Sequence, residues 1–186
     1  RDGRSFVTRR VVALQTAGAI LNLSASFQID ESGEKIQTLS LPGNLPDPEQ
    51  IPSENWSEIM ERKVVPAGVL ETGHGVWLRL NGEADNESST FDLGLVYASD
   101  DAPFDAAARL HPKFDGTWDS DEAPSFFGAS LDHVVWFHQR GNPYDWQFHH
   151  HIGITHMGNR GLATGAIYSK GGMHLATVTQ EILQRF

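Results

Sequence analysis

The chain has 186 residues, enough for one ordinary domain or two small ones with a real hydrophobic core. It contains no cysteine, which excludes disulfides, thiolate zinc sites, iron–sulfur clusters and a cysteine nucleophile. Because 14 Lys and Arg stand against 24 Asp and Glu, the formal net charge is −10 and a nucleic-acid partner is not expected. No membrane association is expected either, since no apolar stretch approaches ~18 residues.

The first predicted element is a β-hairpin. Residues 5–15 are rich in β-formers, residues 16–19 favour a turn, and residues 21–29 alternate apolar and polar side chains as a strand does. Residues 30–66 then hold five of the 9 prolines among Glu, Asp, Ser and Gly. This composition predicts a linker and a domain boundary, with one short helix near Glu54–Arg62.

The rest of the chain predicts a strand, a buried helix and a meander of strands. Residues 76–80 predict the strand, and residues 89–99 a helix that is apolar on most sides. Gly94 inside this helix indicates close packing against a neighbouring strand. An irregular stretch marked by prolines follows. Further strands are predicted over 126–138, 146–157, 160–168 and 173–183. A helix against such strands makes an α+β unit.

Polar residues in this region are candidates for chemistry. Asp100 follows the predicted helix, where the helix dipole disfavours a carboxylate, so it is either a solvated charge or a functional group. Ser130 and Asp132 should project from one face of their strand and His133 from the other, which excludes a Ser–His pair. Gln180 shares a face with apolar residues and must satisfy its amide with backbone, or else position a water or a substrate carbonyl.

His149 and His151 form a further group. Consecutive strand residues alternate faces, so only these two members of the run of three histidines can converge. Two histidines without a nearby third ligand make a weak metal site. A strand with partly buried imidazole rings is the simpler interpretation, and neither a metal nor a cofactor is expected. A His-dependent metal hydrolase remains the less favoured alternative.

The order of short motifs is more specific than any one of them. The motifs are the hairpin 5–28, Tyr97–Asp100, Ala129–His133, Trp136–His138, Arg160–Ala163 and Thr179–Glu181. Together, and across nearly the whole chain, they resemble the acyl-CoA thioesterase II family. The resemblance implies hydrolysis of fatty acyl-CoA to free fatty acid and CoA. It also implies catalytic roles for Asp100, Ser130 and Gln180, which fall on the family's Asp, Ser or Thr, and Gln.

The resemblance implies a double hotdog, in which each half wraps a helix in a curved antiparallel sheet. We expect residues 67–186 to be the C-terminal hotdog. Residues 31–66 would be a proline-rich linker, and residues 1–30 the trailing strands of an N-terminally truncated hotdog. Since hotdog proteins pair their halves and exposed sheet edges favour pairing, we expect a homo-oligomer. With no targeting signal visible, we expect a cytoplasmic location, or the peroxisomal matrix in a eukaryotic source.

The expected chemistry is direct attack of water on the thioester. Asp100 would accept the proton of the water or hold the water by a hydrogen bond, while Ser130 and Gln180 fix the direction of attack. CoA is polyanionic whereas the chain carries a net charge of −10, so a local basic patch must bind the phosphates. The candidate residues for this substrate-binding patch are Arg79, Arg140, Arg160 and Lys170. A non-catalytic hotdog module that binds acyl-CoA without turnover is the main alternative.

Overall fold

The computed structural model describes residues 2–54, 57–83, 88–114, 116 and 127–185. The chain divides into two compact units, Arg1–Ile36 and Gln37–Phe186. The first unit contains the predicted hairpin, in which β1 (Phe6–Gln15) pairs antiparallel with β2 (Gly18–Gln28). Gly18 follows the turn with a φ of 124°, a conformation that glycine adopts without strain.

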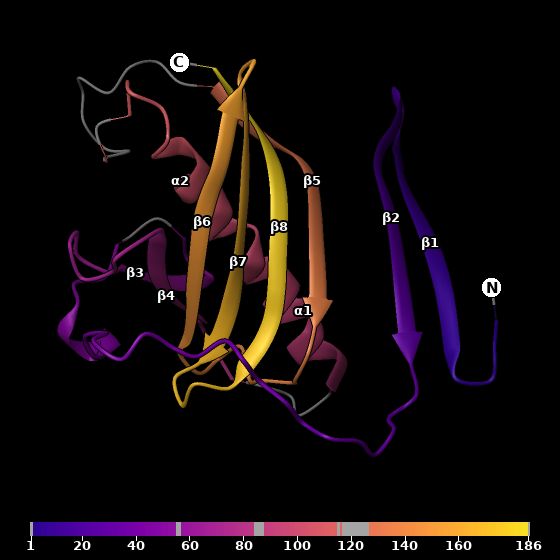
Figure 1. Cartoon of the computed structure of the whole chain (residues 1–186). Coiled ribbons are helices and arrows are strands. Elements are labelled where there is room, and N and C mark those ends of the chain that lie inside the picture. The colour runs from indigo at the N-terminus through magenta and orange to yellow at the C-terminus, as the bar shows by residue number, and fades with distance from the viewer. Residues whose placement is uncertain (1, 55–56, 84–87, 115, 117–126, 186) are drawn as a thin grey trace. The chain divides into compact units, whose positions relative to one another are not determined.

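The second unit is a six-stranded antiparallel sheet with two helices against one face (Figure 1). The strand order is β3-β4-β6-β7-β8-β5, so β3 and β5 end the sheet. The strands are β3 (Met60–Val64), β4 (His74–Leu80), β5 (Phe127–Phe137), β6 (Gln147–Met157), β7 (Arg160–Ser169) and β8 (His174–Arg185). The helices are α1 (Ser88–Ser99), α2 (Asp101–Ala108) and the short 3-10 helix η1 (Pro48–Gln50). The predicted α+β arrangement is confirmed.

The helices lie close to the sheet because small residues face it. Ala102 and Ala107 are fully buried, and a Cβ atom added to Gly153 of β6 would lie 2.5 Å from the carbonyl oxygen of Ala106. The packing expected at Gly94 is confirmed, since a Cβ there would lie 2.6 Å from Pro143 and 3.0 Å from Leu80 of β4. Within the described part of the chain, neither helix has the length and apolarity needed to cross a bilayer.

Pro103 sets the boundary between the two helices. A proline has no N–H, and its ring clashes with the carbonyl four residues earlier, which here belongs to Ser99. Helix α1 ends at Ser99 and α2 begins at Asp101, so that Asp100 is the N-cap residue of α2. The sequence predicted only an irregular stretch here. Pro103 is instead accommodated in the first turn of α2, where a backbone N–H has no partner inside the helix.

Part of the predicted linker belongs to the fold. Met60–Val64 pairs with β4 as strand β3, and Glu54 forms a β-bridge with Arg62, so the short helix expected near Glu54–Arg62 is wrong. Apolar side chains of the preceding segment cover the sheet face opposite the helices, over Trp77, Trp146 and Phe148. They include Leu41, Leu45 and Ile51. The packing of this segment could not be predicted from periodicity, because four prolines and many polar residues interrupt the spacing of its apolar side chains.

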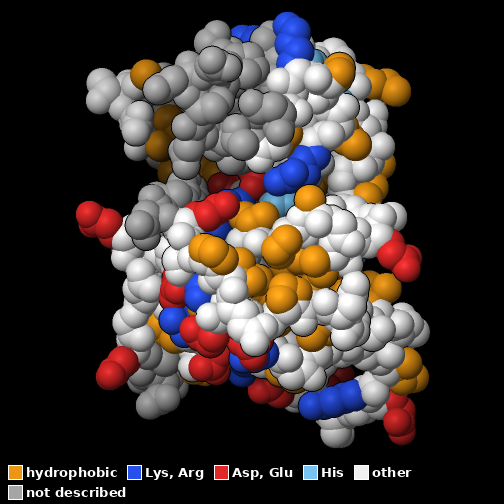
Figure 2. Space-filling model, turned by 90° about the vertical axis from the view of Figure 1, so that its left-hand side faces the viewer, with side chains coloured by type: hydrophobic (Ala, Val, Ile, Leu, Met, Phe, Trp, Pro, Cys, Tyr) orange, Lys and Arg blue, Asp and Glu red, His pale blue; other side chains and the backbone are white. Residues whose placement is uncertain are grey.

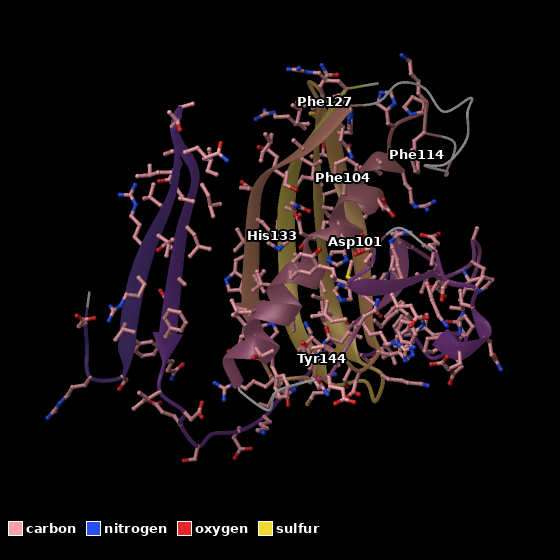
Figure 3. All side chains as sticks on the ribbon, turned by 180° about the vertical axis from the view of Figure 1, so that it is seen from behind. Asp101, Phe104, Phe114, Phe127, His133 and Tyr144 are labelled. Atoms are coloured by element: carbon pink, nitrogen blue, oxygen red, sulfur yellow. The ribbon has the colours of Figure 1, made fainter. Side chains whose placement is uncertain are left out.

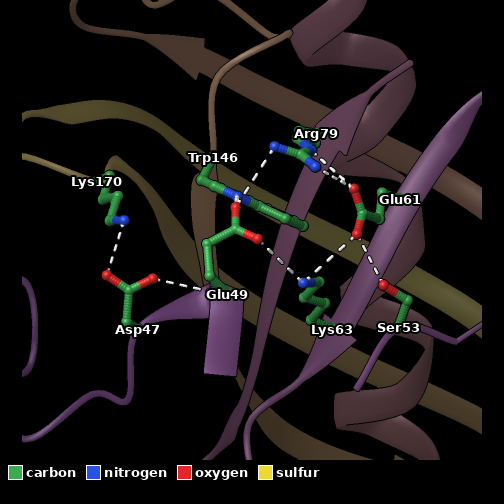
Figure 4. Close-up of polar contacts among 8 residues, drawn as sticks. All are labelled: Asp47, Glu49, Ser53, Glu61, Lys63, Arg79, Trp146 and Lys170. Carbon is green, nitrogen blue, oxygen red and sulfur yellow. Dashed lines mark hydrogen bonds and ion pairs between the residues drawn. The ribbon is translucent and has the colours of Figure 1, made fainter. Parts of the chain in front are cut away.

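Charged residues hold the segment that contains Leu41, Leu45 and Ile51 in place against the sheet (Figure 4). Trp146 Nε1 donates a hydrogen bond of 2.7 Å to Oε1 of Glu49 in η1. The Arg79 guanidinium and Lys63 Nζ lie 4.2 and 5.0 Å from the centroid of the same indole. Arg79 also pairs with Glu61 at 2.5 Å. Arg79, a candidate for CoA binding, is therefore part of the scaffold.

Candidate active site

Asp100, Ser130 and Gln180 come together from three separate elements. Ser130 Oγ on β5 donates a hydrogen bond of 3.0 Å to Asp100 Oδ1 at the helix junction. Gln180 Nε2 on β8 donates to the same Oδ1 and, at 2.7 Å, to Ser130 Oγ. Each member of the predicted trio thus contacts the other two, although 30, 50 and 80 residues separate them in the chain.

The trio joins a buried amide to a carboxylate that water reaches. Gln180 is fully buried in the face that carries Val178 and Ile182, as the alternation of β8 predicted. The Asp100 side chain is 58% exposed. An N-cap Asp normally accepts a hydrogen bond from its own helix, but Asp100 makes no such bond to α2. Its carboxylate is therefore free to interact with Ser130 and Gln180.

A β-bulge in β5 determines which side chains face the site. In the pairing of β5 with β8, Ser130 lies opposite Ile182 and His133 opposite Gln180, with a register shift between Ser130 and Asp132. Since opposed residues project from the same face, Ser130 and His133 both face the helices. The expectation that Ser130 shares its face with Asp132 and not with His133 is wrong, because simple alternation ignores the extra residue of a bulge.

Asp132 has a structural role instead. Its Oδ1 accepts a hydrogen bond of 2.9 Å from the backbone N–H of Glu181. Glu181 lies opposite Asp132 on β8. Because Glu181 is adjacent to Gln180 in the strand, the two side chains project from opposite faces of the sheet. The carboxylate that reaches Ser130 is that of Asp100.

His133 is the site residue that the sequence analysis missed (Figure 3). Its Nε2 lies 2.7 Å from Ser99 Oγ and its Nδ1 lies 4.0 Å from Asp100 Oδ1. Burial lowers the pKa of His133, against the opposing effects of Asp100 and Asp132, so the ring is neutral at pH 7. The signal was present, since His133 closes the motif Ala129–His133, but the face was assigned wrongly.

The carboxylates that follow Asp100 meet a buried cation. Arg62 Nε donates to Asp101 Oδ2 at 2.9 Å, and its terminal nitrogens bind Asp105 and Glu54. His74 Nε2 lies 3.2 Å from Asp105 Oδ2. Burial raises the pKa of Asp101 to about 6, although Arg62 opposes this. Burial also works against the charge of Arg62, but its carboxylate partners outweigh it and raise the pKa of Arg62.

His149 and His151 lie together on the helix-facing side of β6, as the alternation predicted. Both rings are fully buried rather than partly buried, with centroids 6.2 Å apart. Their nitrogens have no hydrogen-bond partner among the described residues. Burial lowers the pKa of His149 to about 3. Burial and the neighbouring histidines lower that of His151 well below its ordinary value. Among the described residues, no three His, Asp or Glu side chains are arranged to hold a metal ion.

The four basic candidates for CoA binding do not form one patch. Each has a carboxylate neighbour: the pairs are Arg79–Glu61 at 2.5 Å, Lys170–Asp47 at 2.9 Å, Arg160–Glu181 at 3.3 Å and Arg140–Asp92 at 4.0 Å. Arg160 is the first residue of β7, whereas Lys170 follows its last residue, Ser169. On the face drawn in Figure 2, Lys and Arg side chains are scattered among Asp and Glu.

The curved sheet around a helix pair places the chain among hotdog proteins. A hot dog fold protein from Alicyclobacillus acidocaldarius superposes with a TM-score of 0.70 at 14% identity. That match covers 100% of this chain and 70% of the other. An acyl-CoA thioesterase II from Mycobacterium marinum gives a TM-score of 0.86 at 30% identity, covering 100% of this chain and 71% of that one. The hotdog fold is confirmed.

Sequence comparison specifies the family. Acyl-CoA thioesterase 2 of Haemophilus influenzae is 28% identical over 209 residues, covering 100% of this chain and 71% of the relative. The family model for the acyl-CoA thioesterase C-terminal domain matches residues 36–184, which is nearly the second unit, Gln37–Phe186. The chain belongs to the acyl-CoA thioesterase family, as its motifs predicted.

Proposed function

We propose that this chain hydrolyses fatty acyl-CoA to a free fatty acid and CoA, with Asp100, Ser130 and Gln180 as its catalytic site. Membership of the acyl-CoA thioesterase family supports the thioester hydrolase activity. The observation that carries the site is the closed set of hydrogen bonds among these three side chains.

Asp100 activates the water in this mechanism. Its Oδ1 accepts hydrogen bonds from Ser130 and Gln180, while Oδ2 receives none from the described residues. A water bound at Oδ2 gives its proton to the carboxylate as its oxygen attacks the thioester carbonyl. Ser130 and Gln180 hold the carboxylate, so the direction of attack is set before the substrate binds. The C–S bond then breaks, and the CoA thiolate takes up the proton.

Ser130 orients the site and does not form an acyl-enzyme. Its hydroxyl proton points at the Asp100 carboxylate, whereas the nearby imidazole of His133 is bonded to Ser99. A serine nucleophile is normally paired with an imidazole base. Rapid quenching of the reaction followed by mass spectrometry should show no acyl group on Ser130. A trapped acyl-Ser130 adduct would contradict direct hydrolysis.

CoA phosphates require cationic partners, and we propose them among Arg140, Arg160 and Lys170. Their ion pairs are at the surface, where such pairs are worth about 0–1 kcal/mol, so a phosphate displaces the carboxylate at little cost. Arg79 is the least available of the four candidates because it is packed on Trp146 and paired with Glu61.

We also propose that the sheet pairs with another hotdog to give an oligomer. Strand β5 ends the six-stranded sheet, and an edge strand is a template for pairing. In this proposal the hairpin Phe6–Gln28 belongs to an N-terminal hotdog. Sedimentation of the purified chain should show a homo-oligomer, whereas a monomer at all concentrations would contradict pairing between copies.

The decisive experiment for the function measures thiol released from acyl-CoA by the purified chain, with and without a metal chelator. We expect hydrolysis that chelator does not change. Acyl-CoA binding without thiol release would favour a non-catalytic module, and loss of activity in chelator would favour a metal hydrolase. Matched assays of Asp100→Asn and Asp132→Asn test the site, since only the first removes the proposed base.

A further inference from the structure

We propose that His133 is a positioning residue for Asp100, an inference that rests on the proposed function. The neutral ring holds Ser99 through Nε2, at 2.7 Å from Oγ, and presents Nδ1 to the Asp100 carboxyl, 4.0 Å away. In this arrangement Nδ1 receives a hydrogen bond from Asp100 only after Asp100 has taken the proton of the attacking water.

The hydrogen bonds of Ser99 define the tautomer of the ring. Ser99 is fully buried, and its Oγ donates its one hydrogen to the carbonyl of Val96 at 2.8 Å. Toward His133, Oγ is therefore an acceptor, which requires the ring hydrogen to be on Nε2. In the neutral ring Nδ1 then carries a lone pair. This atom is buried and has no hydrogen-bond partner among the described residues.

A lone pair beside a carboxylate is useful only when the carboxyl is protonated. At 4.0 Å, Nδ1 and the ionised Asp100 make no hydrogen bond. Once Asp100 holds a proton on Oδ2, rotation of the carboxyl group about its Cβ–Cγ bond places the O–H on the side of the ring, where Oδ1 lies 4.0 Å from Nδ1 in the ionised state. A further approach of roughly 1 Å then gives an ordinary hydrogen-bond distance to Nδ1. His133 thus stabilises a state that exists during the reaction and not before it, which is the condition for lowering a barrier.

The atoms balance over the cycle. An O–H bond of water breaks as its oxygen bonds to the carbonyl carbon, and the proton resides on Asp100, hydrogen-bonded to His133 Nδ1. The carbonyl electron pair moves to oxygen and returns as the C–S bond breaks. The departing thiolate takes the proton, which regenerates ionised Asp100 and neutral His133.

Charged groups around the ring give the arrangement a pH dependence. Asp100 faces the ring from the helix junction, Asp132 lies on the same strand, His151 on β6 acts at longer range, and neutral Gln180 lies opposite on β8. Burial lowers the pKa of His133, against Asp100 and Asp132. Below that pKa the ring gains a proton on Nδ1 and pairs with the Asp100 carboxylate, which removes the base. The rate should therefore fall toward acid through this pKa.

The test compares H133Q with H138Q in the full chain. A Gln amide reaches the position of Nε2 and keeps a donor for Ser99, but it has no lone pair in place of Nδ1 and does not titrate. We expect H133Q to keep the thermal midpoint and KM, to lose at least about tenfold in kcat, and to have the acid limb of its pH–rate profile displaced to lower pH, because only the part of the limb that depends on His133 is removed. His138, which directly follows β5 and is hydrogen-bonded to Thr177 at 2.9 Å, provides the control, and H138Q should behave as the native protein.

An H133Q variant with native kcat and a native acid limb would overturn the proposal. If H133Q fails to fold, or if the native chain releases no CoA, the nitrogen-15 chemical shifts of native His133 decide. A neutral ring protonated on Nε2 supports the arrangement, and one protonated on Nδ1 overturns it. A native chain without thioesterase activity would refute the proposed function, whereas an active chain with a fully active H133Q refutes only the role of His133.

Discussion

Asp100 and Asp101 are neighbours in the chain but belong to two different regions. The Asp100 side chain is 58% exposed and accepts hydrogen bonds from two neutral groups, whereas Asp101 is 8% exposed and faces the Arg62 guanidinium. With a pKa of about 6, Asp101 is still ionised at pH 7, and Arg62 neutralises it. A carboxylate among neutral donors is free to take a proton from water, while one paired with arginine is a structural anion.

The comparison of Asp100 with Asp101 also shows that a strongly shifted pKa does not by itself identify a functional residue. Strongly shifted values often mark active sites. Here the large shifts belong to Arg62, Asp101, His149 and His151, and none of these side chains is hydrogen-bonded to a member of the trio. Burial is the largest cause of the shifts of Asp101, His149 and His151. The nature of the hydrogen-bond partners is therefore the better guide to the catalytic carboxylate.

The largest expected effect comes from removing the buried cation. Arg62→Met leaves Asp101 and Asp105 as uncompensated buried charges, and should lower the free energy of unfolding by about 3–5 kcal/mol in urea titrations. Arg160→Met is the matched control, because its pair with Glu181 is exposed and worth at most about 1 kcal/mol. Equal losses in the two variants would contradict a structural role for the Arg62 cluster.

Asp100→Asn should lower the reaction rate, in contrast to Arg62→Met, which should lower the stability of the fold. The variant keeps the shape of the side chain but cannot accept a proton from water. We expect kcat to fall by about 10²-fold or more, which is about 2.7 kcal/mol of barrier, at nearly unchanged stability. Asp132→Asn serves as the control, since Asp132 bonds the backbone of Glu181 rather than Ser130. A fully active Asp100→Asn would exclude Asp100 as the base.

Acid should lower the free energy of unfolding because of the buried histidines of β6. The pKa of His149 falls from 6.5 in the unfolded chain to about 3 in the fold, so between these values the unfolded state binds more protons. Stability therefore decreases as the pH falls through this window, by up to about 1.4 kcal/mol per pH unit for each such histidine. Asp101 acts in the opposite direction between 3.8 and about 6, since its pKa is raised in the fold.

The contribution of His149 to the pH dependence of stability can be measured by substituting this residue. Urea unfolding of the native chain and of His149→Leu at pH 7 and pH 5 gives two slopes, and the contribution of Asp101 cancels in their difference. We expect the variant to have the shallower dependence on pH. Identical slopes would show that His149 is not buried in neutral form.

Ser130 should give the smallest change of this series. Ser130→Ala removes one of the two donors to Asp100 Oδ1 but leaves that of Gln180, so we expect roughly a tenfold loss in kcat. Ser130→Thr keeps the hydroxyl and should retain most of the activity. If the alanine variant lost all turnover and the threonine variant formed an acyl adduct, Ser130 would be a nucleophile.

Strands with regular alternation could be predicted from the sequence. The strand predicted over 160–168 is β7, Arg160–Ser169, and the strand predicted over 126–138 is β5, Phe127–Phe137, with residue 126 outside the described part. The buried face of Gln180 and the convergence of His149 with His151 follow from the same period of two. Local repetition is encoded in neighbouring residues, so a single sequence displays it.

Features that depend on contacts between distant segments could not be predicted in this way. The bulge beside Ser130 is a property of the pairing of β5 with β8, and it reverses the faces of Asp132 and His133. Strand β3 lacks a clear period of its own and exists because β4 pairs with it. Pro103 was read as a mark of irregular structure, although a proline in the first turn is compatible with a helix.

Three successive residues have different hydrogen-bond partners: Ser99 contacts His133, Asp100 contacts Ser130 and Gln180, and Asp101 contacts Arg62. Successive helical residues point about 100° apart, so the direction of each side chain depends on its position in the sequence. Inserting or deleting one residue within Ser99–Asp101 would change the directions of these side chains relative to one another, so that they could no longer all reach their partners. This stretch should therefore have a fixed length in any chain that keeps the activity, however freely the surface turns vary.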